Sequence, residues 1–239
     1  RDQPRSRGLG DVYKRQVVLS VTSALQSQVV IKENAIQSKY AFPLVTSKAK
    51  AVVVYDTDDY LVVRKTAELF VSDVESVTGQ QLRLTDKLKG DKEIIIVGTV
   101  EKNRLIRQLA EKGKLDISSL EGTWERFLIQ TVSRPFPGVS KALVVAGSDR
   151  RGAAYGLFSL SEMMGVSPWY WWADVPVKKH KTLYVDAPAT LSKTPSVKYR
   201  GIFLNDEDWG LKPWAAKTFE KERGNIGPRT SVSYTHLRA

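Results

Sequence analysis

Short apolar runs alternate with amphipathic stretches through the middle of the chain. Three such runs lie at residues 51–55 (AVVVY), 93–97 (EIIIV) and 142–146 (ALVVA). Runs of this kind are typical of strands that are covered on both faces. In residues 60–77 and 101–112, apolar side chains recur at helical spacing. The pattern predicts a domain in which helices pack on a sheet, an α/β fold.

Capping residues indicate where these helices begin and end. Asp58 or Asp59 precedes the first periodic stretch, and a carboxylate there can accept the free amide protons of the first turn. Gly79 follows the same stretch and predicts a left-handed end. For the second helix, the corresponding N-terminal cap is Thr99.

A third helix is predicted after the run at 142–146, with Ser148 or Asp149 as its cap. Gly152 and Gly156 lie four residues apart, so they fall on one face and allow a close approach to a neighbouring element. We interpret this helix as part of the core.

Arg150 and Arg151 fall in the first turn of that helix, where the helix dipole disfavours cations. Either the two side chains extend into solvent, or they face an anion bound beside the helix end. The residues alone favour solvent, because an exposed charge costs little at this position.

Gly98 and Gly147 each stand between a predicted strand and a predicted helix. Neither belongs to a GxGxxG or GxxxxGK[ST] pattern. We therefore interpret both as tight turns and assign no nucleotide.

Four adjacent aromatic residues occupy positions 169–172 (WYWW). Aromatic rings stack on sugars, and they also fill interfaces between domains. Because four consecutive side chains cannot all face one ligand, we expect most of them to lie in a seam between two domains.

A second strand-like segment, residues 196–204, follows a predicted short linker between Pro188 and Pro195. It ends directly in four polar residues, Asn205-Asp206-Glu207-Asp208. In a β/α barrel the carboxyl ends of the strands line the active site, and carboxylates there can act as acid or base. The alternative is an acidic turn that opens the next helix, and the local sequence leaves both interpretations open.

Composition narrows the functional classes. The chain has 239 residues, a net charge of +11 and no cysteine. Its cations are spread among acidic residues without a nucleic-acid-binding motif, and no apolar run is long enough to span a membrane. The two histidines, His180 and His236, are far apart in sequence, which argues against a histidine-based triad or a zinc site. We expect no metal, no cofactor and no nucleic-acid partner.

The sequence divides into five segments. Residues 1–16 and 231–239 resemble translated adapter sequence, and we predict that they are non-native. Residues 17–28 fit the remnant of a secretory signal, with a buried strand as the equal alternative. The remaining segments are an α/β domain at 29–190 and the start of a second domain at 196–230.

The strings GSDRRGAAYGLFSLSEMMGVSPWYWWADVP (147–176), PSVKYRGIFLNDED (195–208) and GNIGP (224–228) resemble glycoside hydrolase family 115, the xylan α-1,2-glucuronidases. The resemblance implies a small α/β sandwich domain like the second domain of hexosaminidases, followed by a (β/α)8 barrel. Residues 199–204 would form the first barrel strand. It also implies a periplasmic or secreted enzyme that removes glucuronic acid, or its 4-O-methyl ether, from glucuronoxylan with inversion.

The same resemblance assigns roles to particular residues. Asp206 and Glu207 would be catalytic, and Asn205 and Trp209 would contact substrate. Our own addition is that Arg150 and Arg151 meet the substrate carboxylate through charge-assisted hydrogen bonds.

An inverting hydrolase needs two carboxyl groups about 6.5–9.5 Å apart, and neighbouring residues on one short segment cannot supply such an opposed pair. We therefore expect a partner carboxylate on later barrel strands that this sequence lacks, and no activity from the 239 residues alone. Two alternatives remain at this point: a non-catalytic carbohydrate-binding module, and a fragment of a hexosaminidase-like glycosidase. The oligomeric state is open, a dimeric parent being one option.

Overall fold

The predicted alternation of strands and helices is present in the structure, a computed structural model that describes residues 28–170, 175–201, 211–218 and 221–224. The chain divides into two units. The first contains the residues up to Val166 together with Val177–Thr194, and the second contains Ser167–Pro176 and the residues from Pro195 onward.

A six-stranded sheet organises the first unit. Its strands, in spatial order, are β4 (Arg83–Thr85), β3 (Val52–Val54), β5 (Glu93–Thr99), β7 (Lys141–Gly147), β6 (Phe127–Ser133) and β9 (Thr190–Leu191). The first four strands run parallel, and β6 and β9 are antiparallel to their neighbours. The apolar runs at 51–55, 93–97 and 142–146 therefore contain the central strands β3, β5 and β7, and the α/β prediction is confirmed.

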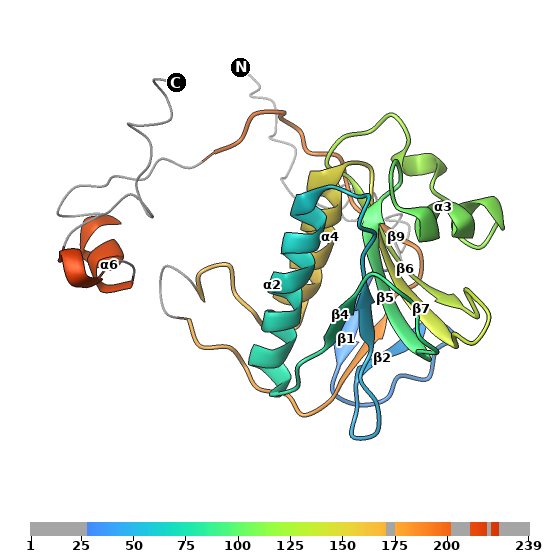
Figure 1. Cartoon of the computed structure of the whole chain (residues 1–239), viewed down its shortest axis with the longest axis horizontal. Helices are drawn as coiled ribbons and strands as arrows, with labels where there is room; N and C mark the ends of the chain where they lie inside the picture. Colours follow the sequence, from blue (N-terminus) through green and yellow to red (C-terminus); the bar gives the residue numbers. More distant parts are fainter. Residues whose placement is uncertain (1–27, 171–174, 202–210, 219–220, 225–239) are drawn as a thin grey trace, which may run out of the picture. The chain divides into compact units, whose positions relative to one another are not determined.

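Helices cover both faces of this sheet. Helices α2 (Leu61–Thr78) and α4 (Arg150–Met163) lie side by side on one face, and α3 (Arg104–Glu111) lies on the other (Figure 1). Alternate residues of each central strand point to opposite faces. Val53 and Ile95 accordingly join the core beneath α2 and α4, whereas Ile94 and Ile96 join the core beneath α3. The short 3-10 helix η1 (Ser118–Leu120) adds Leu120 to the second core.

A second, three-stranded sheet was not predicted. It consists of β1 (Val30–Lys32), β8 (Leu183–Asp186) and β2 (Ala41–Val45), in the antiparallel order β1-β8-β2. Phe42 and Leu44 of β2 are completely or almost completely buried in the core beneath α2 and α4. The small sheet thus extends that core, so the first unit has more than one sheet layer.

The predicted helix caps are partly wrong. Neither Asp58 nor Asp59 caps α2, whose N-cap residue is Tyr60 and makes no side-chain capping hydrogen bond. The Asp59 carboxylate instead accepts hydrogen bonds from Thr99. Asn103 takes the place predicted for Thr99, because its Oδ1 accepts from the amide of Ile106 at the start of α3. The left-handed end of α2 at Gly79, with φ of 70°, is confirmed.

The start of α4 follows the sequence prediction closely. Asp149 is the cap, and its Oδ1 accepts from the amides of Arg151 and Gly152 at 2.9 and 2.8 Å. A Cβ atom added at Gly152 would lie 2.2 Å from the carbonyl oxygen of Arg126, and one at Gly156 would lie 2.5 Å from Val145 Cγ1. The close approach predicted for this pair of glycines is therefore confirmed.

Between residues 188 and 204 the structure differs from the sequence prediction. The linker between Pro188 and Pro195 is wrong in part, because Thr190–Leu191 form β9 and Ser192 Oγ accepts from the amide of Phe127. Of the predicted strand 199–204, the described residues 199–201 belong to no strand, and the others lie outside the described residues.

The described part of the second unit contains α6 (Leu211–Thr218) and a short 3-10 helix, η2 (Lys221–Arg223).

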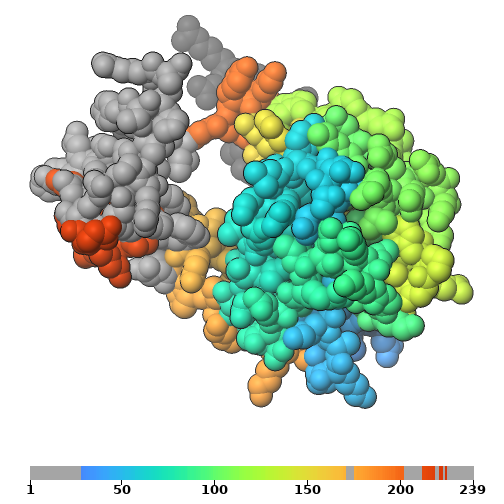
Figure 2. All heavy atoms as spheres, viewed as in Figure 1, coloured from blue at the N-terminus to red at the C-terminus, as the bar shows by residue number. Residues whose placement is uncertain are grey.

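In the first unit, α2 presents Leu61, Val62 and Leu69 to the surface, and this helix crosses the face seen in Figure 2. Within the residues described, no helix combines the length and apolar character needed to cross a bilayer.

The contact between α4 and β6 predicts a stability effect. Gly152→Ala should lower the free energy of unfolding by about 1–3 kcal/mol, because the new methyl group overlaps the Arg126 carbonyl and outweighs the higher helix propensity of alanine. Urea denaturation of the purified chain measures the change. Ser159→Ala, at a half-buried position of the same helix, is the matched control and should leave stability within about 0.5 kcal/mol. A Gly152 variant as stable as the wild type would contradict the close contact.

Candidate functional site

The carboxyl edge of the parallel strands is the usual position of a ligand site in a sheet of this kind. Strands β3, β5 and β7 end side by side, in register along the sheet. The chain leaves β3 for a helix on one face and leaves β5 for a helix on the other, so the two loops diverge between these strands. In open α/β sheets, ligands bind at such a switch point.

Here the switch point is occupied by the chain's own side chains. The buried Asp56 accepts hydrogen bonds from the Arg104 amide, Nε and Nη2 at 2.9, 2.9 and 3.1 Å. Asp59 accepts from the Thr99 amide and hydroxyl at 2.7 and 2.9 Å. These contacts join the loop after β3 to the start of α3, so both carboxylates stabilise the fold at this edge.

The environment moves the pKa values of the two carboxyls in opposite directions. Burial acts to raise the pKa of Asp56, but the hydrogen bonds from Arg104 and from the Asp58 amide outweigh it and hold the pKa below its usual value. For Asp59, burial dominates over the hydrogen bonds from Thr99 and Tyr60, and its pKa is raised. Two carboxyls whose pKa values shift in opposite directions can mark an acid and a base. Here, burial and hydrogen bonds within the fold account for both pKa shifts.

Beside this pair, the Tyr60 hydroxyl donates to Glu101 Oε2 at 2.9 Å, and this hydrogen bond raises the pKa of the phenol. Two cations approach the Tyr60 ring: Lys102 Nζ at 4.1 Å and the Arg150 guanidinium carbon at 5.8 Å from the ring centroid. Arg150 thus lies at the carboxyl edge, and it belongs to the first turn of α4, as the sequence predicts.

The two arginines that open α4 have different surroundings. Arg151 Nη1 lies 2.7 Å from Glu125 Oε1, and Glu125 is only 5 % exposed. The amide of Glu125 donates to Asp149 Oδ2 at 2.7 Å, which ties this acid to the helix cap. Arg150 is exposed and forms no ion pair within the described part of the chain. Of the two, Arg150 is the one whose charge is unmatched.

The two glycine turns at this edge are packed closely against the following helices. A Cβ at Gly98 would lie 2.3 Å from Asn103 Nδ2, and one at Gly147 would lie 2.1 Å from the Ala153 amide nitrogen. Both glycines are required by close packing of the chain on itself. This supports their interpretation as tight turns.

Four predicted site residues lie outside the described residues: Asn205, Asp206, Glu207 and Trp209. The same holds for Trp171 and Trp172, whereas Trp169 and Tyr170 are 62 % and 47 % exposed. The seam predicted for the tryptophans therefore remains a prediction.

Sequence reasoning missed three structural residues at this edge: Asp56, Asn103 and Glu125. Asp56 follows a buried strand directly, which is a detectable feature, whereas the pairing of Glu125 with Arg151 joins residues 26 positions apart and has no local pattern. Among the described residues, no three histidine, aspartate or glutamate side chains come together as a metal site.

Comparisons with known proteins identify the family. The family model for glycosyl hydrolase family 115 matches residues 192–238. The solved structure of BtGH115A, a family GH115 4-O-methyl-α-glucuronidase with specificity for decorated arabinogalactans, is 36 % identical over 79 % of this chain, with a TM-score of 0.61. The chain belongs to glycoside hydrolase family 115. It spans 23 % of the length of that relative.

Two further structures are more distant. CpGH84D is 14 % identical, covers 69 % of this chain and 23 % of its own, and has a TM-score of 0.39. The GH20 β-N-acetylhexosaminidase from Streptomyces coelicolor A3(2) is 11 % identical over 69 % of this chain and 25 % of its own, with a TM-score of 0.36. Similarities of this size support no argument about function. A comparison with curated proteins gives no match.

The family match also touches two earlier predictions. Its range includes residues 205–207, where the catalytic segment is expected, and residues 231–238, which the sequence analysis predicts to be non-native. The non-native tail, like the other segment boundaries, stays a prediction.

The carboxylate pair at the sheet edge predicts a pH-dependent stability effect. Asp56→Asn should lower the free energy of unfolding at pH 7 by about 1–3 kcal/mol, because it weakens hydrogen bonds to a buried charge. The folded-state pKa of Asp56 is lowered, so its contribution is complete above the unfolded-chain pKa of about 3.9 and declines as the pH falls through the folded-state value. Urea denaturation at pH 7 and at about pH 3 should show the difference narrowing.

Asp58→Asn is the matched control. This side chain is 72 % exposed and its carboxylate lies 4.0 Å from Arg104 Nε, so its loss should cost less than about 0.5 kcal/mol. Equal losses in the two variants would show that the buried hydrogen bonds of Asp56 are not the cause.

Proposed function

We propose that this chain is the N-terminal part of an exported, inverting glycoside hydrolase that removes glucuronic acid, or its 4-O-methyl ether, from glucuronoxylan. The observation that carries the proposal is the 36 % identity to a 4-O-methyl-α-glucuronidase over 79 % of the chain. The family match at residues 192–238 supports it independently, because this range contains the acidic segment after residue 204.

In this proposal Asp206 and Glu207 are the catalytic carboxyl groups contributed by the chain, and Asn205 and Trp209 contact the sugar. An acid must protonate the leaving oxygen while a base activates water on the opposite face of the ring. Two adjacent residues cannot occupy both positions, so one of them works with a carboxylate from elsewhere in the longer protein.

The charge distribution at the start of α4 supports a role for Arg150 in binding the uronate. A carboxylate that approaches the carboxyl edge would meet a cation without a counter-ion within the described residues. Arg151 differs, because its guanidinium already pairs with Glu125 at 2.7 Å. We therefore propose that the Arg150 side chain contacts the substrate carboxylate directly. Arg151 acts indirectly, because its ion pair with Glu125 holds the start of α4 in position.

A second substrate is favoured by one observation. The relative with 36 % identity is a 4-O-methyl-α-glucuronidase with specificity for decorated arabinogalactans. Parallel assays on glucuronoxylan and on arabinogalactan distinguish the two. The first proposal predicts a higher kcat/KM on glucuronoxylan, and a higher value on arabinogalactan would replace it.

The catalytic proposal predicts where activity resides. The 239-residue chain should release no uronic acid, whereas an extended protein that adds a complete family 115 barrel should release it. In the extended protein, Asp206→Asn or Glu207→Gln should lower kcat by about 10²–10⁴-fold, as expected for loss of an acid or base. Chromatography of the released sugar measures both effects.

Asp208→Asn is the matched control on the same segment and should retain activity within about tenfold, a loss far below that of an acid or base. Release of uronic acid by the 239-residue chain, or equal losses at Asp206, Glu207 and Asp208, would contradict the assignment.

The two arginines predict different phenotypes in the extended protein. Arg150→Ala should raise KM by about tenfold on acidic substrates and lower the free energy of unfolding by less than about 1 kcal/mol, because its guanidinium forms no ion pair among the described residues and lies 5.8 Å from the centroid of the Tyr60 ring. Arg151→Ala should lower the free energy of unfolding by about 1–3 kcal/mol, since it leaves the buried Glu125 without its cation. Steady-state kinetics and urea denaturation separate the two outcomes. A stability loss for Arg150→Ala with unchanged KM would overturn the division of roles.

A further inference from the structure

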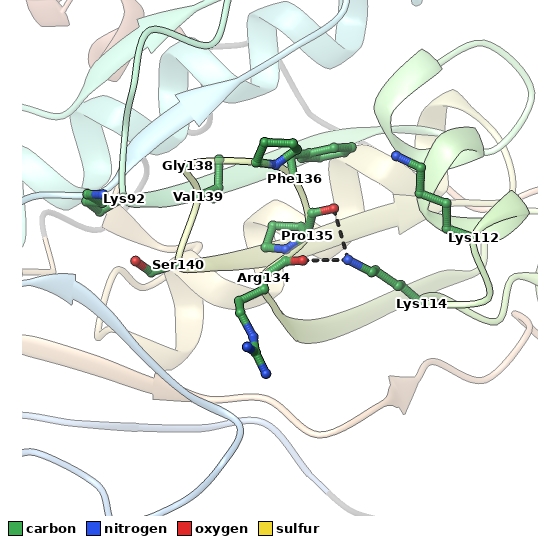
Figure 3. A pocket seen from close by; sticks show the side chains of 10 residues that line it. Lys92, Lys112, Lys114, Arg134, Pro135, Phe136, Gly138, Val139 and Ser140 are labelled. Carbon is green, nitrogen blue, oxygen red and sulfur yellow. Dashed lines mark hydrogen bonds between the residues drawn. The ribbon is translucent and has the colours of Figure 1, made fainter.

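A basic hollow lies at the opposite, amino edge of the sheet. It has a cavity volume of ≈ 590 Å³ and is lined by the loop 134–140 between β6 and β7, by Lys92 before β5, and by Lys112 and Lys114 after α3. Figure 3 shows Lys92 and Lys112 on opposite sides of the hollow. All of its residues belong to the first unit.

The lining of this hollow carries four cations and no carboxylate: Lys92, Lys112, Lys114 and Arg134. None of the four forms an ion pair within the described residues. Lys114 Nζ donates to the carbonyl oxygens of Arg134 and Pro135 at 2.5 and 3.4 Å, which fixes its position without cancelling its charge (Figure 3). Uncompensated like charges repel one another, so an anion placed between them would lower the electrostatic energy.

Helix chemistry explains only part of this arrangement. Lys112 and Lys114 follow the C-terminal end of α3, where cations are favoured by the helix dipole. Lys92 and Arg134 come from strand ends and gain nothing from a helix. Arg134 also holds a left-handed backbone with φ of 46°, an unfavourable conformation for a residue of this type. Such strain is concentrated at functional positions.

A second hollow adjoins the first through Lys114. It has a volume of ≈ 270 Å³, and its lining includes Lys39 and Tyr40. Each hollow thus has cations and one half-buried aromatic ring, Phe136 in the first and Tyr40 in the second. Lys112 Nζ lies 5.7 Å from the Phe136 ring centroid, and Lys39 Nζ lies 4.8 Å from the Tyr40 ring centroid. Neighbouring hollows that combine cations with aromatic rings fit an extended chain of sugars that carries carboxylates better than they fit one small inorganic anion, because aromatic faces contact sugar rings and cations bind carboxylates.

We propose that this basic hollow is a second binding site for an acidic oligosaccharide, built from residues other than Arg150 and the acidic segment 205–208. The proposal rests on the proposed function only in its choice of ligand, a uronate-bearing saccharide. It would hold a negatively charged stretch of the polymer while another stretch is processed.

Titration of the 239-residue chain with a glucuronic-acid-substituted xylo-oligosaccharide tests the site. A neutral xylo-oligosaccharide of the same length and inorganic phosphate serve as reference probes, with calorimetry at low ionic strength as the measurement. We expect the acidic sugar to bind at least about tenfold more tightly than either reference, with a difference that shrinks in high salt because exposed charges are screened.

The variant Lys92→Gln/Lys112→Gln/Arg134→Asn should reduce the affinity for the acidic sugar by about tenfold. Asparagine is chosen at residue 134 because it tolerates a left-handed backbone. The control Lys48→Gln/Lys87→Gln/Lys89→Gln removes the same charge from exposed positions outside the hollow and should keep the wild-type affinity. Thermal melts verify that both variants are folded.

Three results would overturn the proposal: no preference for the acidic over the neutral sugar, equal affinity for phosphate, or equal losses in the two triple variants. These outcomes are independent of the catalytic proposal. An extended protein that hydrolyses its substrate while the 239-residue chain shows no preference would refute the second site alone. Binding without hydrolysis by the extended protein would refute the catalytic proposal alone.

Discussion

The close packing of α4 on the sheet determines the geometry of the carboxyl edge. The helix can approach β6 and β7 this closely only because Gly152 and Gly156 lack side chains at the contact. Its N-terminal turn is fixed by the Asp149 carboxylate, which accepts hydrogen bonds from the amides of Arg151 and Gly152 and also from the amide of Glu125. Arg151 completes this connection by pairing with the buried Glu125. The orientation of the first turn thus follows from steric and hydrogen-bonding constraints, and it leaves Arg150 as the arginine of this turn that forms no ion pair among the described residues.

The same edge illustrates why fold alone is a poor guide to function. The diverging loops after β3 and β5 form the type of crevice in which many α/β proteins bind ligands. In this chain Asp56, Arg104, Asp59 and Thr99 hydrogen-bond across it. Opposite pKa shifts at two carboxyls would suggest acid–base chemistry, yet burial and hydrogen bonding account for both. The edge is stabilised by these contacts, and the catalytic proposal rests on the family relationship.

The sequence predicted the central strands, the three main helices and the glycine contact of α4, because each depends on local pattern: apolar runs, helical spacing and paired small residues. The small sheet was missed because β1, β2 and β8 pair over more than 130 residues of sequence, and β2 contains a proline that disguises it. The cap prediction at Asp59 failed for a related reason: its carboxylate accepts from Thr99, 40 residues away, and from the Tyr60 amide, and not from the amides inside the first turn of α2. Arg150 was singled out because a cation is unusual in the first turn of a helix, whereas nothing in the local sequence marks Glu125 as the partner of Arg151.

The two edges of the sheet differ in how their charges are used. At the carboxyl edge, Asp56 and Glu125 have arginine partners, so most of the charge there is neutralised within the fold. At the amino edge, Lys92, Lys112, Lys114 and Arg134 converge without a carboxylate among the lining residues. The dipole of α3 favours Lys112 and Lys114, whereas Lys92 and Arg134 have no ion-pair partner among the described residues and could each be replaced by a neutral polar residue at little cost to stability. Their convergence is therefore better explained by an anionic ligand than by the fold itself.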